Sequence, residues 1–199
     1  MKNKLSILKA YICFFLIFLS STSWADQIQF EATKVETIDK DIVKAFGDVS
    51  IKNINGLVLN ADKLFYDKKK LILEVEGNII GFDHINENKI KAKKIIYYQL
   101  KDLLITIDET VIETKEKYVI ETSNIIYDRL AENISTKEKA FVKDSLNNKF
   151  DLDGFNLSMK DKILKTQNAF LIDNQLNKYR IEKLFFNLKT NEILGKDLN

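Results

Sequence analysis

The sequence predicts an all-β fold of about a dozen antiparallel strands, a β-jellyroll or β-solenoid in which successive repeats pair edge to edge. Three observations support this prediction. A weak pattern of roughly 30 residues recurs about six times from residue 27 onward. Within each copy, apolar and polar residues alternate over runs of about four to eight residues, as in half-buried strands. Sustained helical spacing of apolar residues does not occur after residue 25, so we expect little helix beyond the N-terminal segment.

Each copy opens with an alternating run that reaches a small or polar residue and then an aromatic-rich bend. The clearest openings are residues 57–67 and 118–128. A period of this length indicates stacked supersecondary units, none of which can bury its apolar face alone. Alignment on the small-residue position gives Ala32, Ala61, Ala92, Thr122, Gly154 and, more loosely, Ile181.

Each copy closes with a second apolar run that reaches another recurring signature, seen in Gly47-Asp48-Val49 and Gly77-Asn78-Ile79. A glycine within a strand pattern indicates a bulge or bend, so we expect the strands to turn a corner there. In the closing runs, we assign residues 71, 73 and 75, and residues 103, 105 and 107, to the apolar face.

All the opening runs place their apolar residues on the same face of the sheet, because a shift of one residue would turn their charges inward. Asp151 and Asp153, for example, alternate with Phe150 and Leu152. The apolar side is either a dry core or the lining of a groove for an apolar ligand, and the small-residue column favours the groove because it leaves unfilled space. The predicted groove residues are Ile28, Phe30, Leu57, Leu59, Ala61, Leu73, Val75, Ile90, Ile105, Tyr118, Ile120, Phe150, Leu152 and Tyr179.

The first 25 residues have the pattern of a cleavable secretory signal peptide. Lys2, Lys4 and Lys9 precede the apolar stretch 10–19, and Ser23-Trp24-Ala25 fits a small-x-small cleavage site. An uncleaved anchor is the alternative. Cleavage would leave residues 26–199 as one domain, and it would change the net charge from +2 to about −1, with 28 basic and 29 acidic residues. Nothing in this charge indicates a nucleic-acid partner.

No pattern in the sequence indicates an enzyme. Cys13 is the only cysteine and His84 the only histidine, so His84 has no second histidine or mature-chain cysteine with which to hold a metal. Gly-x-Ser-x-Gly and Walker-type motifs are absent from the sequence. We therefore predict neither catalysis nor a cofactor, and no disulfide after cleavage.

The repeat resembles that of the OstA-like lipopolysaccharide-transport family. The resemblance rests on Asn60-Ala61-Asp62-Lys63-Leu64-Phe65-Tyr66-Asp67 followed by Glu76-Gly77-Asn78-Ile79, with further copies at residues 47–49 and 127–128. It extends over nearly all of residues 26–199. The motifs are clearest over residues 42–82 and degenerate after about residue 130.

This resemblance implies a repetitive, twisted open β-jellyroll in the periplasm. Such a jellyroll carries the lipid A acyl chains of lipopolysaccharide in an apolar groove toward the outer membrane. Its implied partners are lipopolysaccharide and other jellyroll proteins of the same transport system, joined by pairing of edge strands. The six repeats and the cleavable signal pattern favour the N-terminal domain of an LptD-like protein, to which a C-terminal outer-membrane barrel would belong. The alternatives are a free LptA-like bridge and a closed-core structural β-solenoid that binds no lipid.

Overall fold

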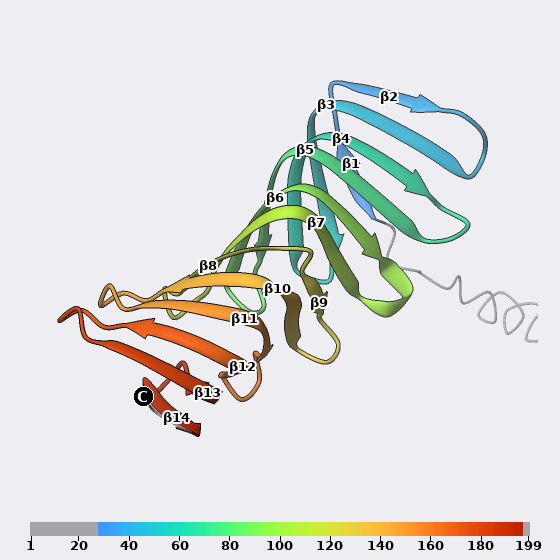
Figure 1. Cartoon of the computed structure of the whole chain (residues 1–199). Coiled ribbons are helices and arrows are strands. Elements are labelled where there is room, and N and C mark those ends of the chain that lie inside the picture. The colour runs from blue at the N-terminus through green and yellow to red at the C-terminus, as the bar shows by residue number, and fades with distance from the viewer. Residues whose placement is uncertain (1–27, 197–199) are drawn as a thin grey trace, which may run out of the picture.

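The computed structural model describes residues 28–196, which form one antiparallel sheet of fourteen strands (Figure 1). The all-β prediction is confirmed, and the one helical element of this part is a single 3-10 turn, η1 (Gln99–Lys101). The strands are β1 (Gln29–Glu31), β2 (Lys34–Thr37), β3 (Ile42–Ile54), β4 (Leu57–Asp67), β5 (Ile72–Asp83), β6 (Asn88–Tyr98), β7 (Leu103–Glu113), β8 (Val119–Ser123), β9 (Ile126–Asp128), β10 (Asn133–Lys143), β11 (Lys149–Ser158), β12 (Ile163–Ile172), β13 (Lys178–Asn187) and β14 (Glu192–Lys196).

The strands follow one another across the sheet almost in chain order. Two positions are shared: β8 and β9 both lie between β7 and β10, and β1 and β2 both pair with β3. The fourteen strands therefore fill twelve positions in the sheet, in agreement with the predicted dozen. The N-terminal segment predicted as a signal peptide lies outside the described residues. No helix of residues 28–196 has the length and apolarity to cross a membrane.

Most long strands bend near the middle, where the pairing register shifts. The shifts lie between residues 46 and 49 of β3, 60 and 63 of β4, and 76 and 79 of β5. Gly47 and Gly77 occupy these bends with φ of +73° and +95°, a backbone region that favours glycine. The predicted corner at the glycine signature is thus confirmed.

The bends fold the sheet over itself into two arms, and the strands in Figure 1 curve accordingly. We call the half that ends at turns 38–41, 68–71, 99–102, 129–132, 159–162 and 188–191 the first arm. The half that ends at turns 55–56, 84–87, 115–117, 145–148 and 174–177 is the second arm. Phe150 of the second arm stacks on Phe186 of the first, with ring centroids 4.9 Å apart, so the inner faces of the two arms pack together.

The core between the arms consists of side-chain rows that run across the strands. Cross-strand neighbours pack as a unit, and a fully buried aliphatic side chain stabilises the fold by about 1.5–3 kcal/mol. The main row of the first arm is Tyr66, Leu73, Tyr97, Leu104, Tyr127, Ile134, Leu157, Leu164 and Phe186. That of the second arm is Ile51, Leu59, Gly81, Ile90, Ile112, Ile120, Val142, Phe150, Leu171 and Tyr179.

The predicted parity of residues 103–107 is wrong. Leu104 and Thr106 point inward and are fully buried, whereas Ile105 lies half-buried on the outer face, opposite Ile96 and Ile126. This run is apolar at four of its five positions, so its alternation does not distinguish the two faces. Pairing with the neighbouring strands decides the parity, because it places Leu104 in line with Tyr97 and Tyr127.

Candidate functional site

We call the edge of each arm that carries its turns the margin of that arm. The two margins are joined near the middle of the molecule by a buried ionic cluster. Arg129, just after β9 in the first arm, donates from Nη1 to Asp102 Oδ1 at 2.7 Å, and its Nε lies 3.4 Å from Asp83 Oδ2 in the second arm. Tyr127 donates its hydroxyl to Asp83 Oδ2 at 2.6 Å, and Tyr97 donates to Asp102 Oδ1 at 2.8 Å. The Arg129 side chain is 3% exposed and that of Asp83 is fully buried. We call these five residues the clasp.

Asp83 of the clasp keeps its negative charge at neutral pH. Burial by itself would raise the pKa of Asp83, but the hydrogen bonds from Tyr127 and Asn86 and the charge of Arg129 outweigh burial and lower that pKa below its ordinary value. Burial, together with the adjacent carboxylates, raises the pKa of Tyr97 and of Tyr127. Both phenols therefore remain protonated and can donate their hydrogen bonds.

Further polar contacts join the margins on the C-terminal side of the clasp. Lys162 of the first arm pairs with Glu116 of the second at 3.2 Å. The hydroxyl of Tyr118, the residue before the second-arm strand β8, donates to Asn191 Oδ1 at 2.5 Å. Each contact joins a second-arm segment to a first-arm turn farther along the chain. The two arms are therefore staggered, and the second arm extends past the first at the C-terminal end of residues 28–196.

This stagger leaves a pocket of about 370 Å³ at the C-terminal end of the interior. Its apolar wall comes from both arms and its rim is polar, the arrangement expected of a small-molecule site. We call it the C-terminal mouth. Its walls are Phe150, Leu171, Tyr179 and Ile181 of the second arm with Phe186 and Ile193 of the first, and its rim is Asp144, Asn148, Asp173 and Asn191.

Of the predicted groove residues, only Phe150 and Tyr179 line the C-terminal mouth. Phe30 and Tyr179 are half-buried, while Ile105 lies on the outer face. The buried members are Ile28, Leu57, Leu59, Ala61, Leu73, Val75, Ile90, Tyr118, Ile120, Phe150 and Leu152.

The prediction omitted Leu171, Phe186 and Ile193 from the groove. Leu171 follows Asn168-Ala169-Phe170, a weaker copy of the closing signature, and Phe186 lies one alternation step from Leu184, so the repeat pattern contained a signal for both. Ile193 had no such signal, because its contact with the pocket depends on how the last strand pairs. Among residues 28–196, no group of three or more histidine, cysteine or carboxylate side chains could hold a metal ion.

Several solved protein chains are similar to this structure. No family model and no curated protein sequence matches the chain. The structure is similar to LptH, described as the LptA-homologous periplasmic component of the lipopolysaccharide transport device from Pseudomonas aeruginosa. The TM-score is 0.47 at 18% sequence identity, and the alignment covers 52% of this chain and 76% of LptH.

Proposed function

We propose that the chain is a periplasmic lipopolysaccharide-transport protein that holds lipid A acyl chains between its two arms and admits them at the C-terminal mouth. The observation that carries this proposal is the mouth itself, an apolar opening into the interior at the end where the second arm extends past the first. The motif resemblance at residues 60–79 supports the choice of ligand, and the signal-peptide pattern at residues 1–25 supports the location.

The chemistry of the mouth suits an amphiphile with a polar head. Each acyl methylene that leaves water for an apolar wall contributes about 0.8 kcal/mol. The Asp144 and Asp173 carboxylates at the rim are held by backbone amides of their own turns, Asp144 by Leu146 and Asn148 and Asp173 by Gln175 and Asn177. An acyl chain can therefore enter between the aromatic walls while its sugar head stays at the polar rim, in water.

Lipid can move deeper only if the arms separate. Leu57, Leu59 and Leu73 have no exposed surface, and the clasp joins the margins beside them. We therefore propose that the mouth is the resting site, and that opening of the clasp extends it into a continuous groove. An edge strand such as β14, which pairs on one side only, can add the strand of another jellyroll and prolong the groove. Both an LptA-like bridge and an LptD N-terminal domain would use this arrangement.

A second function is favoured by the same closed region. A structural jellyroll that binds no lipid would also have a dry core and paired margins, as this chain has around the clasp. The two functions differ in what the interior contacts in the cell. The carrier places lipid against Tyr179, whereas the structural protein leaves that side chain facing only protein and water.

Site-specific photo-crosslinking in cells separates the two. A photoreactive phenylalanine at Tyr179 should label lipopolysaccharide, while one at the neighbouring outward Arg180 should not. The same probe at Leu59 should label only if the arms open. Absence of lipid adducts at Tyr179, or equal labelling at Tyr179 and Arg180, would refute the carrier.

A further inference from the structure

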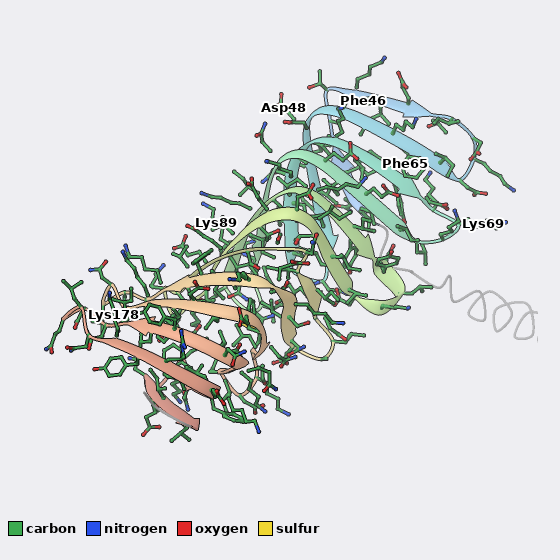
Figure 2. All side chains as sticks on the ribbon, in the orientation of Figure 1. Phe46, Asp48, Phe65, Lys69, Lys89 and Lys178 are labelled. Carbon is green, nitrogen blue, oxygen red and sulfur yellow. The ribbon has the colours of Figure 1, made fainter. Side chains whose placement is uncertain are left out.

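The two hairpins beside the C-terminal mouth expose leucines at their tips. Leu146, between β10 and β11, is 55% exposed, and Leu176, between β12 and β13, is 78% exposed. The tips lie side by side, since the Asn174 amide donates to Asn148 Oδ1 at 2.9 Å. They lie at the free end of the second arm, where Figure 2 labels Lys178. Single exposed apolar residues are common, but a contiguous patch of them marks a surface that binds a partner, so the side chains around the two tips decide.

The outer face behind these tips combines apolar and basic side chains. One row across the strands consists of Val119, Lys143, Lys149, Ile172 and Lys178. The next row holds the exposed Phe141 and Phe170. These two residues line a hollow of about 620 Å³ together with the first row except Lys178. Glu121 and Asp151 also face this hollow, so the surplus positive charge lies in the row nearest the tips.

The three lysines of that row are not used within the fold. Lys143, Lys149 and Lys178 are exposed, and none of them forms an ion pair with another residue of the described chain. Lys143 and Lys149 are direct cross-strand neighbours, and like charges in this arrangement destabilise a sheet. Their charge is therefore available to an anionic partner.

Leu176 is likewise unfavourable for the fold alone. Its φ is +68°, in the left-handed region, and the equivalent position of the preceding hairpin holds Asn147 at the same φ. Asparagine tolerates this region better than leucine does. Both turns close with the same two backbone hydrogen bonds. The Asp173 amide donates to the Asn177 carbonyl and the Leu176 amide to the Asp173 carbonyl, and residues 144, 147 and 148 repeat this pattern. A leucine that is strained and mostly exposed indicates a role outside the fold.

We propose that this hairpin pair is a docking surface for an anionic lipid bilayer. The leucines insert between headgroups, and Lys143, Lys149 and Lys178 bind the lipid phosphates. Docking would bring the C-terminal mouth to the bilayer surface, because Asp144, Asn148 and Asp173 belong both to these turns and to the rim of the mouth. The docking does not depend on lipid entering the interior, so it can fail or succeed separately from the carrier function.

The test uses the full chain with Cys13→Ser, which removes the only native cysteine. An environment-sensitive dye then attaches to one new cysteine and not within the apolar N-terminal stretch. The dye is attached at Asn174→Cys on the docking tip, or at Ala131→Cys beside the exposed Leu130 of a first-arm turn. Vesicles contain either phosphatidylcholine alone or phosphatidylcholine with phosphatidylglycerol. We expect a blue-shifted emission and protection from an aqueous quencher at position 174 only, and only with the anionic vesicles.

Two variants identify the side chains responsible. Leu146→Gln with Leu176→Asn gives each leucine the residue at the equivalent position of the other hairpin, Gln175 and Asn147 respectively. The fold should therefore be retained while the emission shift at position 174 is lost. Replacement of Lys143, Lys149 and Lys178 by glutamine should weaken partitioning about 100-fold, since each lysine near an anionic surface contributes about fivefold. Leu130→Gln is the matched control and should change nothing. No shift at position 174, an equal shift at 131, or equal shifts with neutral vesicles would overturn the proposal.

Discussion

Replacement of Arg129 by methionine tests whether the clasp holds the two arms together. Methionine keeps most of the aliphatic volume but removes the charge and the donors to Asp83, Asp102 and the Asn55 carbonyl. Two buried carboxylates are then left without their cation. Removal of one partner from a buried ion pair costs about 3–5 kcal/mol, a large share of the roughly 5–15 kcal/mol that stabilises a typical domain.

The measurement is urea unfolding followed by far-UV circular dichroism at about pH 7.5 and again at about pH 4.5. Asp83 has a lowered pKa in the folded wild type, so its contribution to stability is present above its unfolded value and is lost as the pH falls through the folded value. Without Arg129, burial is less opposed and the pKa of Asp83 rises. Protonation then relieves the unpaired charge in the variant, so we expect the stability difference from the wild type to narrow at the lower pH.

Two further variants sharpen this test. Lys93→Met breaks the exposed Lys93–Glu109 pair and should leave stability almost unchanged, because solvent screens that pair. Adding Asp83→Asn and Asp102→Asn to Arg129→Met removes the stranded charges and should recover much of the loss. The clasp does not hold the arms together if Arg129→Met costs no more than Lys93→Met, or if the cost of Arg129→Met is the same at both pH values.

The remaining predictions concern other parts of the fold and are measured by the same unfolding assay. Gly154→Ala should cost about 1–3 kcal/mol, because φ is +71° and the added Cβ would lie 2.9 Å from the Thr136 carbonyl oxygen; a cost near zero would contradict the strained bend. Tyr118→Phe should cost about 0.5–1.5 kcal/mol, because it removes the hydrogen bond to Asn191. An unchanged stability would show that this contact between the margins does not stabilise the fold. Leu176→Asn should leave stability unchanged or raise it by up to about 1 kcal/mol, and a clear loss would show that the leucine supports the turn.

The repeat pattern predicted much of the fold because it is a local property of the chain. Strand parity at Leu57, Leu59, Phe150 and Leu152 is confirmed, since alternating charges can lie only on the wet face. The bends at Gly47 and Gly77 were also predictable, because a positive φ in a strand selects glycine. At Ile105 the same reasoning failed, because apolar residues on both faces give parity no contrast.

The candidate site could be predicted only in part. The sequence indicated an apolar interior, and Phe150 and Tyr179 do reach its open end. It gave no sign that the interior is closed beside Leu59, because the closure depends on Arg129 meeting an aspartate 46 residues earlier in the chain. The leucine tips were not predicted either, since an isolated leucine in a polar turn has no periodicity.

The sequence by itself determined a stack of antiparallel strands with one apolar face and a bend in each repeat, because alternation and glycine placement act over a few neighbouring residues. Only the tertiary structure decided how far one arm is displaced along the other. That displacement places Asp83 beside Arg129 and leaves Tyr179 at an open mouth. It accumulates from the pairing and twist of all the strands, so no single repeat encodes it.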